Sequence, residues 1–124
     1  LSHIKNNSGL KPLLLSSPDS VRDWGYAEEY INFIFQKPDD FNDAMLVTGF
    51  SWSVRDLVDA FINAVGQDKL MVTWDESEVI DVNENKRNRY LITEKQREYL
   101  WFPKYYGNNL VARLIEDLYE PPKK

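Results

Sequence analysis

Apolar residues recur at three- and four-residue spacing between Val54 and Val65, which predicts an amphipathic helix over this range. Ser53 is a good N-cap for it, because a serine hydroxyl can accept a hydrogen bond from a first-turn amide. Gly66 is a good C-terminal stop. The stripe consists of Val54, Leu57, Val58, Phe61, Ile62 and Val65.

A second amphipathic helix is predicted at the end of the chain, with Asn108 or Asn109 as its cap and Tyr119 as its last residue. A shorter helix is predicted just before it, capped by Thr93 and running to Leu100. The stripe of the last helix consists of Leu110, Val111, Leu114, Ile115 and Leu118.

A third long helix is predicted from Tyr26 to Gln36, and its pattern differs from the other two. Glu28 and Glu29 favour the helix dipole in the first turn. The apolar residues cover more than one stripe, so this helix should need two packing partners. If one partner lies outside the chain, part of the apolar surface should be uncovered.

Four short apolar runs predict β-strands: Leu10–Leu15, Ala44–Thr48, Lys69–Trp74 and Glu78–Val82. Lys11 and Pro12 interrupt the first run, which suits an edge strand, and Gly49 closes the second. The polar stretch Asn83–Arg89 is predicted to be a loop. The pattern therefore predicts an α+β fold with one domain over residues 1–120 and a disordered tail over residues 121–124.

Composition excludes several classes of partner and of chemical site. The 124 residues carry a formal charge of −5 with basic clusters only at residues 86–89 and 123–124, which argues against nucleic acid as a partner. The absence of cysteine excludes disulfides, a thiolate nucleophile and cysteine-based metal sites, and a single histidine, His3, excludes a multi-histidine site. No apolar run is long enough to cross a membrane, so we expect a cytoplasmic protein.

The most specific motif is the turn that begins Arg22-Asp23-Trp24-Gly25-Tyr26 and runs into the acidic, apolar start of a helix. This turn resembles the Arg-Asp-Trp-Gly-His-Ala segment of the extended short-chain dehydrogenases, the superfamily of NAD-dependent epimerases and dehydratases. Within it, the chain is most similar to the GDP-mannose 4,6-dehydratase family. Proteins of this kind couple an NAD(P)-binding Rossmann domain to a smaller C-terminal domain that grips the nucleotide diphosphate of a sugar nucleotide.

Three further landmarks follow in the order of that family. They are Val47-Thr48-Gly49 with Ser53-Val54-Arg55-Asp56, then Val79-Ile80-Asp81-Val82, and then the segment from Glu94 to Lys104 that contains Leu100-Trp101-Phe102-Pro103. The chain also departs from the family. Tyr26 replaces a histidine, Leu100 replaces the glycine of a Leu-Gly-Trp motif, and the segment from Asn83 to Arg89 lacks the proline of an arginine-containing loop.

The resemblance implies three substrate-binding residues. Arg22 stands where related enzymes place an arginine on the substrate diphosphate, and a planar guanidinium suits phosphate oxygens. Arg87 and Arg89 are candidates for a second phosphate contact. The competing interpretation is a surface ion pair for Arg22 and a solvated charged loop for Arg87 and Arg89. Asp23 is expected to bind backbone amides and Trp24 to belong to the core.

Other groupings have structural interpretations that compete with functional ones. The adjacent acids Asp39-Asp40, Asp75-Glu76 and Glu116-Asp117 suit solvated turns and helix faces better than a cation site. The aromatic group of Trp101, Phe102, Tyr105 and Tyr106 suits a core beneath a proline turn better than a binding patch.

The catalytic equipment of the superfamily is not expected in this chain. Its glycines, at positions 9, 25, 49, 66 and 107, are too far apart for a dinucleotide fingerprint. The one Tyr-x-x-x-Lys spacing, Tyr119 to Lys123, contains two prolines and cannot form the helix that the catalytic pair requires. We expect no catalytic, cofactor or metal residue here.

The resemblance thus implies the small C-terminal substrate-binding domain of a larger enzyme whose Rossmann domain is absent from this chain. The full-length protein would bind NADP, take GDP-mannose or a similar nucleotide sugar, and form a homo-oligomer. Leu1 is not an initiator methionine, which agrees with a fragment. Alternatives are a related epimerase, a noncatalytic module that binds a nucleotide sugar or a protein, and an unrelated α+β interaction domain.

Overall fold

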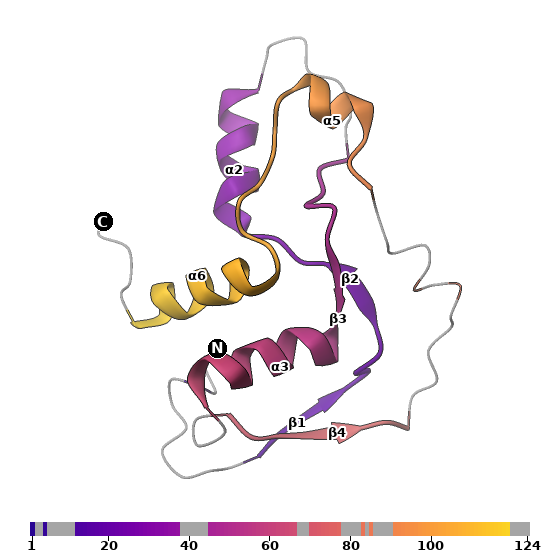
Figure 1. Cartoon of the computed structure of the whole chain (residues 1–124), viewed down its shortest axis with the longest axis vertical. Coiled ribbons are helices and arrows are strands. Elements are labelled where there is room, and N and C mark those ends of the chain that lie inside the picture. Colours follow the sequence, from indigo (N-terminus) through magenta and orange to yellow (C-terminus); the bar gives the residue numbers. More distant parts are fainter. Residues whose placement is uncertain are drawn as a thin grey trace.

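A computed structural model describes residues 1, 4, 12–37, 45–66, 70–77, 83, 85 and 91–119. This part of the chain contains both helices and short strands, which confirms the mixed α and β content (Figure 1). The elements are β1 (Leu13–Ser16), β2 (Val21–Asp23), α2 (Ala27–Gln36), β3 (Ser51–Ser53), α3 (Val54–Val65), β4 (Val72–Asp75), α5 (Glu94–Glu98) and α6 (Gly107–Tyr119).

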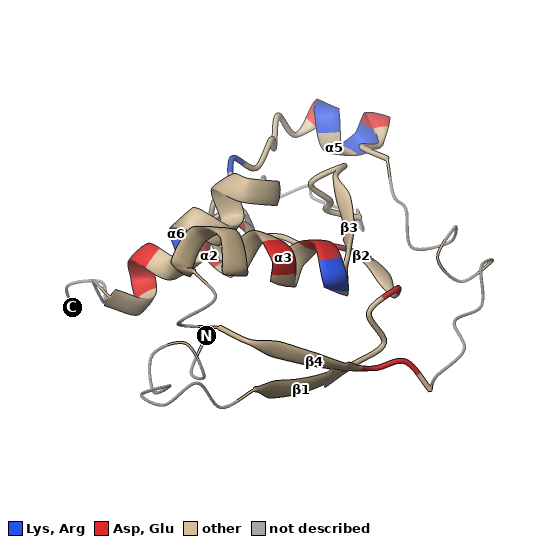
Figure 2. Ribbon diagram, turned by 60° about the horizontal axis from the view of Figure 1, so that its bottom comes forward, with Lys and Arg blue, Asp and Glu red and all other residues tan. Residues whose placement is uncertain are grey.

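β1 and β4 form a two-stranded parallel sheet in which Leu13 faces Val72 and Leu15 faces Trp74. α3 lies over one face of this pair (Figure 2). The apolar residues of the two strands and of the helix stripe line a shared hollow of about 220 Å³ between the two layers. Leu14 alternates to the opposite face and is exposed.

The start of α3 is fixed as its sequence predicts. The Ser53 hydroxyl accepts a hydrogen bond from the Asp56 amide at 3.0 Å, and the Asp56 carboxylate accepts one from the Ser53 amide at 3.3 Å. This reciprocal capping box satisfies two amides that a helix start leaves unpaired. Gly66 ends the helix with a φ of 91°, a conformation that costs a glycine little.

α6 packs against α3, and its residues Leu110 and Val111 are buried, as the stripe predicts. The helix begins at Gly107, one residue before the predicted cap. The carbonyl of Tyr106 accepts the amide of Leu110 at 3.3 Å, so Asn108 and Asn109 already belong to the first turn.

α2 packs on the connection between α5 and α6 through aromatic side chains. The indole of Trp101 contacts the rings of Tyr30 and Phe33, with centroids 4.9 and 5.9 Å apart. The opposite side of the helix is uncovered in the described part of the chain, where Ile31, Ile34 and Phe35 are exposed. The expected uncovered surface of this helix is therefore present.

The predicted strand Ala44–Thr48 is wrong over its described residues 45–48, which lie in an irregular segment. Val47 and Thr48 are buried, but a side chain takes the place of a neighbouring strand. The fully buried Gln96 accepts the Val47 amide at 3.0 Å, and its own amide donates to the Val47 carbonyl at 2.8 Å. The same nitrogen donates to the Trp101 carbonyl at 3.2 Å.

Thr93 caps the short helix as predicted, with its hydroxyl accepting the Gln96 amide at 3.1 Å, but α5 ends at Glu98 rather than at Leu100. Leu100 lies in the left-handed region with a φ of 55°, which explains why the helix cannot continue through it.

Other predictions fall wholly or partly outside the described residues. The strand Glu78–Val82 and the tail over residues 121–124 lie outside them. Of the predicted loop Asn83–Arg89, only Asn83 and Asn85 are described, and both are helical, so the loop prediction is wrong at these two positions. None of the described helices is long and apolar enough to span a bilayer.

Replacing Gln96 by alanine should destabilise the fold by about 2–4 kcal/mol, because the Val47 and Trp101 polar groups lose their partner and a cavity opens. Urea unfolding monitored by circular dichroism measures the change. Arg97→Ala, an exposed position on the same helix, should shift the unfolding free energy by no more than about 0.5 kcal/mol. A Gln96→Ala variant as stable as that control would contradict the role given to Gln96.

Replacing Leu100 by glycine should stabilise the fold by about 1 kcal/mol, since a left-handed backbone is costly for a residue with a Cβ. Thermal unfolding should show a higher midpoint. Leu91→Gly is the matched control, because Leu91 is 82% exposed and Leu100 is 78% exposed, whereas only Leu100 has a positive φ. Glycine at position 91 should leave the unfolding midpoint unchanged or lower it. Equal effects at both positions would rule out backbone strain at Leu100.

Candidate functional site

Arg22 lies at the centre of β2, which pairs antiparallel with β3 so that Arg22 stands opposite Trp52. Because Val21 is buried, strand alternation directs Arg22 to the outer face of this ribbon, where it is exposed. Its guanidinium donates to the Val21 carbonyl at 2.8 Å. The strand thus presents a cationic side chain outward from a fixed backbone.

Asp23 binds backbone amides, as predicted, although they belong to a distant segment rather than to its own turn. One carboxylate oxygen accepts the amide and the hydroxyl of Thr48 at 3.1 and 2.8 Å. The other accepts the Gly49 amide at 3.0 Å. Gly49 has a φ of 82°, so this turn needs a residue without a Cβ. These hydrogen bonds, called the Asp23 clamp below, join the end of β2 to the segment that precedes β3.

Trp24 is half-buried, and its indole N–H donates to the Trp52 carbonyl at 3.0 Å, which agrees with a structural role. Asn85 was missed by the sequence analysis. Its side chain accepts the Val21 amide at 3.2 Å and donates to the Asp19 carbonyl at 2.8 Å, so it holds β2 from the side. An asparagine in a polar stretch gives no sequence signal for such a contact.

Arg87 and Arg89 lie outside the described residues, so the structure does not place them relative to Arg22. Asn85 is the last described residue before them in the sequence. Its two bonds to the β2 region show that at least this part of the segment from Asn83 to Arg89 reaches the strand that carries Arg22.

Tyr26, which directly precedes α2, joins this helix to α6. Its hydroxyl donates to the carboxylate of Asp117 and accepts from Arg113 at 3.4 Å. Arg113 also forms an ion pair with Asp117 at 3.3 Å and lies over the rings of Tyr26 and Tyr105. The bond to Asp117 raises the pKa of Tyr26 above its ordinary value, and Arg113 opposes this rise by lowering it.

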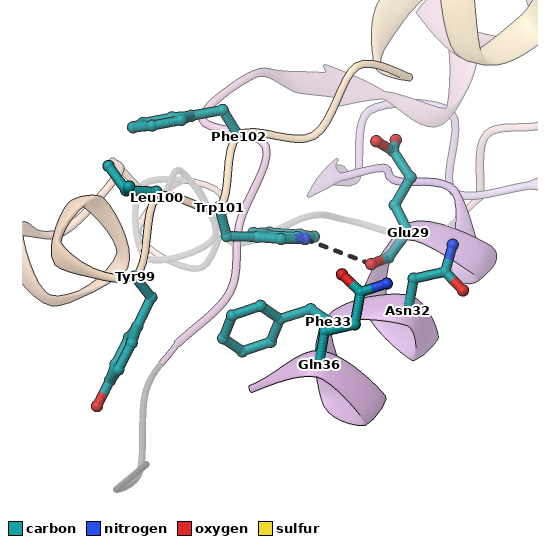
Figure 3. Close-up of a pocket in the computed structure, with 8 residues that line it drawn as sticks. All are labelled: Glu29, Asn32, Phe33, Gln36, Tyr99, Leu100, Trp101 and Phe102. Atoms are coloured by element: carbon teal, nitrogen blue, oxygen red, sulfur yellow. Dashed lines mark hydrogen bonds between the residues drawn. The ribbon is translucent and has the colours of Figure 1, made fainter. Parts of the chain in front are cut away.

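A groove of about 340 Å³ runs between α2 and the connection that follows α5 (Figure 3). The indole N–H of Trp101 crosses it to the Glu29 carbonyl at 3.3 Å. The Glu29 carboxylate accepts the amides of Lys104 and Tyr105 at 2.7 and 2.9 Å, so its position is structural. The lining residues are Glu29, Asn32, Phe33, Gln36, Tyr99, Leu100, Trp101 and Phe102.

A second hollow of about 230 Å³ continues the groove toward Tyr26 and Arg113. Arg22 lines neither of these two hollows. Of the aromatic group predicted to be core, Phe102 and Tyr106 are exposed, whereas Trp101 and Tyr105 are only half-buried. The core prediction is therefore wrong for Phe102 and Tyr106.

The described acidic pairs are engaged in local contacts. Glu76 forms an ion pair with Arg55 at 2.5 Å, and Asp75 accepts the Ser77 amide at 3.0 Å. Hydrogen bonds from the Ser77 side chain and from its amide lower the pKa of Asp75. Glu116 contacts Arg113 at 3.4 Å. Asp39 and Asp40 lie outside the described residues, among which no group of three metal-ligating side chains occurs.

The described residues do not fit a nicotinamide dinucleotide. Such a cofactor needs several glycines in one strand-to-helix turn, so that backbone amides can approach the pyrophosphate. The described glycines at 25, 49, 66 and 107 lie at four separate places in the fold, three in different connections and Gly107 at the start of α6. What the arrangement supplies is an outward cation beside aromatic side chains, which suits the binding of an anionic ligand.

Replacing Tyr26 by phenylalanine should cost about 1 kcal/mol at neutral pH, because the bonds to Asp117 and Arg113 are lost. The raised pKa adds a pH dependence. The stabilising effect of the neutral hydroxyl is complete below the unfolded value of about 10 and disappears as pH rises through the folded value.

Urea unfolding across the alkaline range should therefore show the difference between wild type and Tyr26→Phe shrinking above pH of about 10. Tyr119→Phe, at an exposed tyrosine at the end of α6, serves as the control for removing a tyrosine hydroxyl and should change stability at neutral pH by no more than about 0.5 kcal/mol. A constant difference over the whole range would exclude the Tyr26 hydroxyl as the titrating group.

Comparison with known proteins identifies the family. One curated relative, a GDP-mannose 4,6-dehydratase from Vibrio cholerae serotype O1, is 31% identical over 58 residues. The match covers 45% of this chain and only 16% of that protein, so the chain spans a small part of its relative. The sequence model of the family described as GDP-mannose 4,6 dehydratase matches residues 2–113, most of the chain. The chain therefore belongs to the GDP-mannose 4,6 dehydratase family.

Proposed function

We propose that this chain is the substrate-binding portion of a nucleotide-sugar 4,6-dehydratase that acts on GDP-mannose or a similar sugar nucleotide. The observation that carries the proposal is the position of Arg22, exposed on the outer face of the β2–β3 ribbon within a chain of this family. A guanidinium is charged at any relevant pH, and its planar fork matches the oxygens of a diphosphate.

Rigid backbone support for Arg22 favours binding over a chance surface position. Asp23 fixes the strand on one side of Arg22 through Thr48 and Gly49. Asn85 fixes it on the other side through the Val21 amide. Because the ordering of the backbone is complete before the ligand arrives, less free energy is lost on binding.

Arg87 and Arg89 are proposed as further diphosphate contacts. The support is indirect: Asn85 ties the beginning of their segment to β2, and both arginines follow within four residues along the chain. An arginine from this segment would share the charge of the diphosphate with Arg22, as the resemblance to the family implies.

Catalysis is assigned to a Rossmann domain outside this chain, with NADP bound there. The oxidation at C4 of the sugar, the loss of water across C5 and C6 and the return of hydride would be carried out by that domain. The exposed apolar face of α2, with Ile31, Ile34 and Phe35, is proposed to dock on it, which would place this chain as the smaller C-terminal domain. The chain alone would then be inactive.

A second candidate is a noncatalytic module that binds a nucleotide sugar or a protein. The same uncovered α2 face favours it, since an apolar helix face can also receive a separate partner. A related nucleotide-sugar epimerase would use the same diphosphate contacts. An in-frame glycine-rich strand-turn-helix and a helical Tyr-x-x-x-Lys in the coding sequence before Leu1 would favour the enzyme over the module.

Arg22→Ala should weaken GDP-mannose binding by about 1.5–3 kcal/mol, the magnitude of a hydrogen bond to a charged group. Isothermal titration calorimetry measures the loss. The matched control is Arg97→Ala, which removes an exposed arginine from α5 and should leave affinity unchanged. Equal affinities for wild type and Arg22→Ala would remove Arg22 from the site.

A further inference from the structure

The outer face of the β2–β3 ribbon carries aromatic side chains next to Arg22. Arg22 stands directly opposite Trp52 in the antiparallel register, a position in which side chains contact across strands. The Trp52 ring contacts the Phe50 ring edge to face, with centroids 5.3 Å apart. Phe50 in turn contacts Tyr106, with ring centroids 5.8 Å apart and planes tilted by 39°.

Two of these rings are open to solvent. Phe50 is 37% exposed and Tyr106 is 41% exposed, although both are large and could have been buried. An aromatic pair left at the surface beside a cation is a common arrangement for planar, charged ligands. Neither ring lines the two hollows along α2, so this cluster is a separate feature.

The backbone and the ring of Phe50 are both held in place. Its amide donates to the Thr48 hydroxyl at 3.1 Å, and the same hydroxyl donates to its carbonyl at 3.2 Å or to Asp23 at 2.8 Å. On the other side, Gly107 lies so close that a Cβ there would stand 3.3 Å from the ring. A ring held in this way can offer its face to a ligand without losing much conformational entropy.

We infer that Phe50 and Tyr106 form a platform on which the base of a nucleoside diphosphate stacks while Arg22 holds the diphosphate. Phe50 directly precedes β3, and its ring contacts the ring of Trp52, the residue that stands opposite Arg22 in the register. This placement suits one ligand that carries both a base and phosphates. The inference rests on the proposed function for the diphosphate, and it adds the base as the group that the aromatic rings bind.

The test compares GDP with inorganic pyrophosphate, which has the phosphates without the base. Calorimetric titration of the same chain with each ligand separates the two contacts. Phe50→Ala should weaken GDP binding by about tenfold or more, the effect of losing one stacked base, and should leave pyrophosphate affinity unchanged. Arg22→Ala should weaken both.

Two further variants guard the interpretation. Phe50→Leu keeps an apolar side chain against Gly107 but has no aromatic face, so it should lose GDP affinity while the circular dichroism spectrum stays that of the wild type. Phe102→Ala removes an exposed aromatic ring from the groove along α2 and should bind GDP as the wild type does.

The outcomes distinguish failure of the platform from failure of the proposed function. If Phe50→Ala and Phe50→Leu bind GDP as well as the wild type while Arg22→Ala does not, the platform is wrong and the diphosphate site stands. If both Phe50 variants lose affinity for GDP and for pyrophosphate to the same extent, the proposed stacking of the base on Phe50 is also wrong. If wild type binds neither ligand, the platform falls together with the proposed diphosphate site.

Discussion

A buried backbone segment that has no neighbouring strand among the described residues constrains the rest of this structure. Val47 and Thr48 are buried, so their amides and the Val47 carbonyl face the interior, where unpaired polar groups are costly. Two side chains from distant positions satisfy them: Gln96 binds both polar groups of Val47, and Asp23 binds the amides of Thr48 and Gly49. The segment therefore holds α5 on one side and the β2–β3 ribbon on the other.

The same arrangement explains why the candidate ligand groups lie where they do. Arg22 precedes Asp23, and Phe50 follows Gly49, so each group is one residue from the Asp23 clamp. Binding residues placed beside a satisfied polar network inherit its rigidity. By contrast, the groove along α2 is built on aromatic packing around Trp101, and neither Arg22 nor Phe50 lines it.

Sequence patterns predicted what depends on local periodicity. α3 appears with its cap at Ser53 and its stop at Gly66, and α2 ends at the predicted Gln36 with one apolar side exposed. The strand at residues 45–48 failed because an apolar run does not reveal whether a strand or a glutamine side chain will bind its backbone. The prediction that Asp23 binds amides was right, but their identity depended on the tertiary fold.

The candidate site was predictable to a smaller extent. A motif pointed to Arg22, whereas Asn85 and Phe50 gave no signal, because their roles come from contacts with residues far away in sequence. The Arg113 and Asp117 partners of Tyr26 lie about ninety positions away along the chain, beyond the reach of any local pattern.

Because Gly107 contacts the Phe50 ring, the residues allowed at position 50 depend on the residue at the start of the last helix. Any side chain at position 107 would meet a strained backbone at a φ of 55° and would have to displace the ring. A smaller residue at position 50 would remove the steric part of this barrier and leave the backbone part. The two positions should therefore vary in a dependent manner, with effects in double variants that are not the sum of the single ones.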